Sequence, residues 1–273
     1  MEELRLTYQE YWGYYWRVVS RHKIPGIFEW DQDLVNLIEK QCALKPGASV
    51  LDLGCGGGDQ VKLFARKGYR VVGIDKVRSL IEFATDVFKK EGLSGEFHTA
   101  DMREVEYQNE FDLCVMLSGT FGLPAEKENE QLLQKIHRAL KPDGQTFIDY
   151  LPFESYSRLS HTRSWNTIDG GFSLKEEWFD VPSSTYRSKH IHILMDGKVI
   201  KPAEEAGYNA DEVIRCYGFR EIEDLAKRTG YGVKAHLSKK HIGNPDYIPE
   251  ASEPRGIVIL EKKLNMLIDR LNT

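Results

Sequence analysis

VLDLGCGGGDQ, residues 50–60, is the stretch that decides the fold of this chain. Its short apolar run is typical of a buried strand, and the run ends in glycines. GDQVKLFARKG (58–68) follows as an expected helix, and YRVVGID (69–75) follows as a second buried strand. The order of strand, glycine-rich turn, helix and strand predicts a βαβ unit with parallel strands.

The same alternation continues on both sides of this unit. Helices are expected at 31–44, with Asp31 as the cap, and at 76–91, 126–140 and 219–230; strands are expected at 95–101, 111–118, 145–151, 232–238 and 255–263. Residues 264–273 are expected to form a short amphipathic tail. Strands that alternate with helices are typical of a parallel sheet covered on both faces. We therefore expect an α/β fold with a doubly wound, mostly parallel sheet of seven strands.

Residues 155–217 follow a different pattern. GFSLKEEWFDV (171–181), TYRSKHIHIL (185–194) and DEVIRCYGF (211–219) resemble strands of period two, and Asp196-Gly197 has the chemistry of a tight hairpin turn. We expect this stretch to form an inserted antiparallel β cap. Residues 1–154 and 218–273 would then form the core.

Aromatic side chains crowd the first thirty residues. Tyr8, Tyr11, Trp12 and Tyr15 stand at the spacing of one helix face. Two interpretations are open: the helix packs on the domain, or it forms a lid that closes over a ligand.

Composition excludes several classes of protein. The net charge of −5 over 273 residues gives no basic surface for nucleic acid. No apolar run is long enough for a membrane span, and the first twenty residues do not read as a secretory signal, so the cytoplasm is the expected location. The four cysteines lie far apart, and His190 and His192 have no identifiable third ligand, so we expect no metal site.

The glycine-rich turn has the form Asp-x-Gly-x-Gly-x-Gly, with Asp52, Gly54, Gly56 and Gly58. A dinucleotide site would have Gly-x-Gly-x-x-Gly, and the carboxylate of Asp59 would repel a diphosphate. S-adenosylmethionine carries no phosphate. Glycines would let its amino-acid and ribose atoms approach the backbone, and the carboxylate of Asp52 would lie near its ammonium group.

Two further acids follow the next two strands. Asp75 ends the second strand, where a carboxylate accepts hydrogen bonds from ribose hydroxyls. Asp101 ends the third strand beside Met102, where the carboxylate can accept from an adenine amino group and the thioether can pack on the ring. A helix cap or a turn explains any one of these acids alone, but acids at three successive strand ends favour a ligand site.

These motifs resemble those of the class I methyltransferases that use S-adenosylmethionine, in the branch that modifies small molecules. The resemblance rests on VLDLGCGGG, VVGID, the acid after the third strand, FDLCVMLSGTFG and LKPDG, over about residues 45–150. It implies that the last strand of the sheet is antiparallel. It also implies residues around the cofactor: Asp52, Gly54, Cys55 and Gly56 at the methionine moiety, Asp75 and Lys76 at the ribose, Asp101 and Met102 at the adenine, and Leu117 and Ser118 along the fourth strand.

The inserted segment resembles the cap on which sugar- and amine-modifying relatives bind their acceptors. Candidate acceptor residues are Tyr11, Tyr15, Phe121, Trp178, Tyr186 and Arg187, with Tyr150 and Arg255 as further possibilities. The expected reaction is methyl transfer to a nitrogen or oxygen atom of a small-molecule acceptor. The alternatives are a non-catalytic protein that binds S-adenosylmethionine and an NAD(P)-dependent oxidoreductase. Asn244-Pro245-Asp246-Tyr247 resembles a base-methylating motif but stands after the wrong strand, so a proline turn is expected there.

Overall fold

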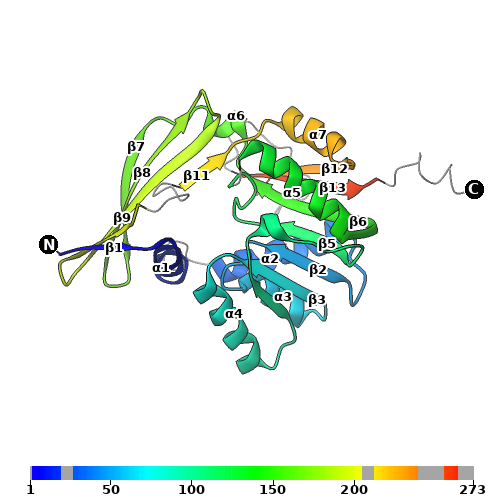
Figure 1. Cartoon of the computed structure of the whole chain (residues 1–273), viewed down its shortest axis with the longest axis horizontal. Coiled ribbons are helices and arrows are strands. Elements are labelled where there is room, and N and C mark those ends of the chain that lie inside the picture. Colours follow the sequence, from blue (N-terminus) through cyan, green and yellow to red (C-terminus); the bar gives the residue numbers. More distant parts are fainter. Residues whose placement is uncertain (1, 20–26, 124, 205–211, 239–254, 264–273) are drawn as a thin grey trace, which may run out of the picture.

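The structure is a computed structural model that describes residues 2–19, 27–123, 125–204, 212–238 and 255–263. Figure 1 shows two sheets, with the helix α1 (Tyr8–Tyr14) beside both of them. Residues 244–247 and 264–273, for which the sequence predicts a turn and a tail, lie outside the described residues. In the described part of the chain, no helix is long and apolar enough to cross a membrane.

The larger sheet, called the core sheet below, has seven strands. Their order is β12 (Tyr231–Ser238), β13 (Gly256–Lys262), β6 (Leu140–Tyr150), β5 (Phe111–Met116), β2 (Ser49–Leu53), β3 (Arg70–Asp75) and β4 (Glu96–Thr99). β13 is antiparallel to both of its neighbours, and every other pair is parallel. The predicted fold is confirmed. Because the strand order reverses between β2 and β5, the carboxyl ends of these strands form the edge at which such sheets bind ligands.

Helices cover both faces of the core sheet. α2 (Ile27–Cys42), α3 (Asp59–Arg66) and α4 (Arg78–Glu91) contribute to one apolar cluster, and α5 (Glu126–Ala139) and α7 (Phe219–Arg228) contribute to the other. Neighbouring residues of β2 alternate between the clusters, with Val50 on one face and Leu51 on the other. All five residues of β2 are buried, because helices cover both faces of the strand, as the apolar run predicts.

Two predicted boundaries differ from the structure. α2 begins at Ile27, so Asp31 does not cap it; instead its carboxylate accepts a hydrogen bond from Gln60 Nε2 at 2.8 Å. β6 begins at Leu140, five residues before the predicted strand 145–151, because Leu140 pairs with Phe111 across a register shift. At this boundary a tertiary contact overrides the local sequence signal.

The smaller sheet, called the cap sheet below, has six strands. The order is β1 (Glu2–Leu6), β10 (Lys198–Pro202), β9 (Thr185–Leu194), β8 (Gly171–Asp180) and β7 (Thr162–Ile168), with β11 (Glu212–Arg215) also paired with β9. The strands β7 to β11 form antiparallel pairs, as expected for the inserted segment. β1 was not predicted: it pairs in parallel with β10 from Glu2 to Leu6, so the amino-terminal residues join the inserted sheet.

The inserted segment leaves and re-enters the core at two neighbouring places. One passage is the short helix α6 (Phe153–Tyr156) after β6, and the other is the turn between β11 and α7. The two passages are hydrogen-bonded to each other: Phe153 N–H donates to Tyr217 O at 3.0 Å, and Tyr217 N–H donates to Leu151 O at 3.1 Å. The inserted segment therefore leaves and re-enters the core at one location.

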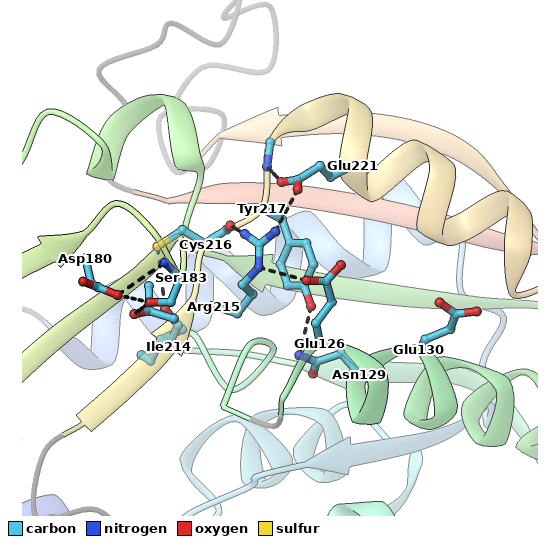
Figure 2. A network of polar contacts seen from close by, with 12 residues as sticks. Glu126, Asn129, Glu130, Asp180, Ser183, Ile214, Arg215, Cys216, Tyr217 and Glu221 are labelled. Carbon is cyan, nitrogen blue, oxygen red and sulfur yellow. Dashed lines mark hydrogen bonds and ion pairs between the residues drawn. The ribbon is translucent and has the colours of Figure 1, made fainter.

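A polar network fixes this junction (Figure 2). Arg215 pairs with Glu221 of α7 at 2.8 Å and with Glu126 of α5 at 3.6 Å, and its guanidinium lies 4.7 Å from the ring centre of Tyr217. The Tyr217 hydroxyl accepts a hydrogen bond from Asn129 Nδ2 of α5 at 3.0 Å. The network ties the end of the cap sheet to two core helices.

Candidate functional site

The glycine-rich turn lies between β2 and α3 at the carboxyl edge. Gly54 and Cys55 donate their N–H groups to Ile74 O at 2.8 and 3.0 Å, which holds the turn against β3. Gly54, Gly56 and Gly58 have φ values of 80°, 54° and 78°, a region that favours glycine. A Cβ added at Gly54 would lie 2.5 Å from Thr120 Cγ2, whereas one at Gly56 would meet no heavy atom within 4 Å. The backbone at Gly56 is therefore open to a ligand.

The carboxyl group of Asp52 lies at the base of this turn and is almost fully buried. Burial, together with the nearby charge of Asp75, raises the pKa of Asp52 to about 8. A cationic ligand beside Asp52 would favour its ionised form. The buried carboxyl thus fits the ammonium end of S-adenosylmethionine.

Asp75, at the end of β3, uses both of its carboxylate oxygens. Oδ2 accepts from Gly56 N–H at 2.9 Å, and Oδ1 accepts from Val77 N–H at 2.8 Å. Burial raises the pKa of Asp75, and backbone hydrogen bonds from Val77, Gly56 and Lys76 oppose the rise. A carboxylate has about four acceptor positions, so one position remains for a ribose hydroxyl.

Asp101, after β4, has a fuller set of partners. Its Oδ1 accepts from the backbone N–H and from Nε of Arg103, and its Oδ2 accepts from Arg103 Nη2 at 2.7 Å and from Lys76 Nζ at 3.2 Å. Burial would raise the pKa of Asp101, but the bonds from Arg103 and Lys76 outweigh it and lower the pKa. All four acceptor positions are used. An adenine amino group would therefore have to replace the long contact with Lys76.

The loop after β5 forms the next part of the edge. Leu117 is buried, and Ser118 is exposed with φ 56°. Ser118 N–H donates to Asp149 Oδ2 of β6 at 3.1 Å, and Asp149 Oδ1 pairs with Arg255 Nη1 at 3.4 Å. Met102 packs against the edge of the apolar cluster below α5. The ten predicted cofactor residues thus lie at the carboxyl ends of β2 to β5 or on the turns that follow these strands.

Charged and phenolic groups extend from this edge to the cap sheet. The rings of Tyr156 and Tyr186 lie 5.2 Å apart, and the Tyr186 hydroxyl donates to Glu177 Oε2 at 2.8 Å. Burial raises the pKa of Tyr186, and so does the charge of Glu212. For Arg255, burial opposes the protonated form, but Asp149, Tyr156 and Glu212 outweigh it and raise the pKa. These groups link Ser118 and Asp149 on the core to β8, β9 and β11.

The predicted residues Tyr11 and Tyr15 pack on the same face of β9. Tyr11 Oη lies 3.2 Å from His192 Nε2, and the Tyr15 ring lies 5.1 Å from the ring of His190. Ser188 on this face bonds both to His190 Nε2 at 3.1 Å and to Glu212 at 2.9 Å. The two histidines thus belong to a buried polar cluster with the tyrosines. Within the described residues, no three His, Cys, Asp or Glu side chains are placed to hold a metal ion.

Other predicted acceptor residues lie elsewhere. Phe121 is fully buried and packs on Tyr217, and Tyr150 is also fully buried in the core cluster. Trp178 and Arg187 are paired across β8 and β9, so they share the face of the cap sheet opposite to Tyr186. The structure therefore brings Tyr11, Tyr15 and Tyr186 together on the core-facing side. It does not bring Phe121, Tyr150, Trp178 or Arg187 there.

Sequence reasoning missed Asp149, Tyr156 and Glu212. Asp149 stands at the end of a strand, as the other three acids do, so the same rule would have found it. Glu212 and Tyr156 are near Arg255 only because the cap sheet folds back on the core, and no local pattern carries that information.

Comparison with known proteins agrees with this geometry. A family model described as a methyltransferase domain matches residues 50–144. The cypemycin N-terminal methyltransferase of a Streptomyces species is 37% identical over 106 residues, and phosphoethanolamine N-methyltransferase of Triticum aestivum is 26% identical over 225 residues. These matches cover 38% and 78% of this chain, and 42% of each relative. The chain thus spans less than half the length of these curated relatives.

Solved structures share the whole architecture at low identity. A methyltransferase of Clostridium acetobutylicum that depends on S-adenosylmethionine has a TM-score of 0.73 at 16% identity, over 92% of this chain and 96% of that one. An amino pentose methyltransferase of Micromonospora echinaspora, solved with its cofactor, has a TM-score of 0.65 at 16% identity, over 95% and 99%. The fold is thus the one that these solved methyltransferases share. This chain contains a methyltransferase domain at residues 50–144.

Proposed function

We propose that the chain transfers a methyl group from S-adenosylmethionine to a nitrogen or oxygen atom of a small molecule. One observation carries the proposal: Asp52, Asp75 and Asp101 end three successive strands of the core sheet, around the open backbone of Gly56. The glycine-rich turn does not suit a diphosphate, because the carboxylate of Asp59 would repel it.

Different residues would hold the different parts of the cofactor. Asp52 and the turn Gly54-Cys55-Gly56 would hold the methionine moiety, Asp75 and Lys76 would hold the ribose, and Asp101 and Met102 would hold the adenine. Leu117 and Ser118 would line the cofactor from the end of β5. When bound, S-adenosylmethionine supplies a methyl group that a sulfonium already activates. The chain then has to align the acceptor and exclude water.

We place the acceptor between this edge and the cap sheet, beside Tyr15, Tyr186 and Arg255, with residues 155–217 and β1 forming the cap. Asp149, Glu177 and Glu212 contribute three carboxylates there, against the two cations Lys175 and Arg255. This balance favours an amine over an acceptor that carries a carboxylate. The N-methyltransferase relative from Triticum aestivum and the amino pentose enzyme also support an amine.

Calorimetric titration with S-adenosylhomocysteine, with NAD as control, tests the cofactor. We expect micromolar binding of S-adenosylhomocysteine alone; binding of NAD alone would favour an oxidoreductase, and binding of neither would overturn the proposal. Asp75→Ala should weaken binding about 100-fold without unfolding the protein, because charge-assisted hydrogen bonds to the ribose are lost. Asp86→Ala, at an exposed carboxylate of α4, is the matched control.

Turnover separates the enzyme from a protein that only binds the cofactor. Release of S-adenosylhomocysteine should be measured with a panel of primary amines, phenols and amino acids that are matched in size. We expect amines without a carboxylate to react fastest. Tight cofactor binding with no turnover on any acceptor would favour a non-catalytic role. The four buried cysteines, each with a free thiol, support the cytoplasm as the expected compartment.

A further inference from the structure

The helix α1 touches the core at the turn that carries Asp75. Gln9 Nε2 donates to Lys76 O at 2.9 Å, and Gln9 Oε1 accepts from Arg78 N–H at 2.9 Å. Asp75 itself accepts from Val77 N–H in the same turn. The side-chain amide of Gln9 is thus hydrogen-bonded to Lys76 O and Arg78 N–H, on either side of the Val77 N–H that positions the Asp75 carboxylate.

The packing around Gln9 is close. Gly13, one turn further along α1, is buried, and a Cβ there would lie 2.5 Å from Ser79 Oγ. The Tyr8 ring lies 5.7 Å from Lys76 Nζ, the same ammonium group that pairs with Asp101. The helix therefore contacts the backbone and the cation between the proposed ribose and adenine positions.

The opposite side of α1 belongs to the cap sheet. Tyr11 Oη bonds to His190 O and His192 Nε2 of β9 at 3.3 and 3.2 Å. Before the helix, β1 pairs with β10 over its whole length, and Leu6 O accepts from Ala203 N–H at 2.7 Å. A displacement of the Asp75 turn would thus be passed through one short helix to two strands of the cap.

We propose that α1 couples the cofactor site to the cap sheet and that Gln9 is the positioning residue of this coupling. This inference rests on the proposed function. Cofactor binding would order the turn 75–78, dock α1 and fix the cap, so the cofactor would bind before the acceptor. Because coupling is reciprocal, loss of the Gln9 contacts would weaken cofactor binding although Gln9 is not among the proposed cofactor ligands.

Two measurements on the full chain test this coupling with S-adenosylhomocysteine as the probe. Gln9→Ala should lower its affinity about three- to tenfold, the effect of two exposed hydrogen bonds. Hydrogen exchange should show that S-adenosylhomocysteine protects amides of α1 and β10 in the parent protein, and that Gln9→Ala loses this protection but keeps that of β2 and β3. Gln131→Ala, at an exposed glutamine of α5, is the matched control.

A second variant keeps the result interpretable. Gln9→Glu retains an acceptor for Arg78 N–H but loses the donor to Lys76 O, so it should behave as Gln9→Ala does. The inference is overturned if both variants bind S-adenosylhomocysteine like the parent protein, or if the cofactor protects the turn 75–78 while α1 and β10 exchange at an unchanged rate. Failure of the parent protein to bind would instead contradict the proposed function.

Discussion

The carboxyl edge of the core sheet and the core-facing side of the cap sheet are built in different ways. At the edge, Asp52 and Asp75 lie in the last two residues of β2 and β3, and Asp101 comes two residues after β4, so each carboxyl group is placed by local chain geometry. On the cap, Tyr186 and Glu212 reach Arg255 only through long-range pairing of β8, β9 and β11. The edge can therefore be predicted from local sequence signals, whereas the arrangement of the cap depends on how the two sheets are joined.

The largest effect is expected when a glycine of the edge, rather than a glycine of the cap, is replaced by alanine. Gly54→Ala should lower the free energy of unfolding by about 2 kcal/mol or more and abolish cofactor binding, because the new Cβ meets Thr120 at a positive φ. Gly197→Ala in a turn of the cap also has a positive φ but no neighbour within 4 Å. It should cost about 1 kcal/mol, with unchanged affinity. Chemical denaturation and calorimetry would measure both; equal losses of affinity would contradict the comparison.

Substitution of Asp52 tests whether this carboxyl group lowers the stability of the free protein while it strengthens cofactor binding. Since its pKa is about 8, above the unfolded value, the folded chain holds a proton that the unfolded chain releases, and stability falls as pH rises from about 4 to 8. Asp52→Asn should be about 1 kcal/mol more stable at pH 8 and bind S-adenosylhomocysteine about tenfold more weakly.

The parent protein should bind this ligand more tightly as pH rises from 6 to 8, and it should release a proton on binding. Titrations in buffers with different ionisation enthalpies would detect the proton. A pH-independent affinity would show that Asp52 does not face the cationic end of the ligand.

Tyr186 tests the cap without touching the edge. Tyr186→Phe removes the hydrogen bond to Glu177 on the core-facing side and should reduce kcat/KM for the best acceptor about tenfold, with unchanged affinity for S-adenosylhomocysteine. Trp178→Phe, on the opposite face of the same sheet, should leave kcat/KM unchanged. A reversed order of the two effects would place the acceptor on the outer face.

The smallest effect is expected at the junction. Tyr217→Phe removes the hydroxyl that accepts from Asn129 and should lower the free energy of unfolding by about 1 kcal/mol. The affinity for S-adenosylhomocysteine should not change, because the junction lies away from β2 and β3. Thermal denaturation beside calorimetry would separate the two outcomes.

The sequence predicted the core sheet and the inserted antiparallel segment because apolar runs, glycine turns and hairpin chemistry are local signals. It also predicted a helix over the amino-terminal tyrosines, and α1 confirms that helix. It did not predict β1, whose five residues form a strand only because β10 offers an open edge. Nor could the sequence show that Tyr186 faces the core and Trp178 faces away from it. Period-two alternation assigns residues to two faces, but α6 and the junction determine which face meets the core.

The neighbouring passages at Leu151 and Tyr217 have a consequence for how such a protein can evolve. A segment whose two ends meet at one point on its host can be exchanged for another segment without re-routing the chain. Acceptor preference could thus diversify by replacement of the insertion while the cofactor half is inherited unchanged. Because β1 is part of the exchanged sheet, a transplant of the insertion would have to carry the first six residues with it.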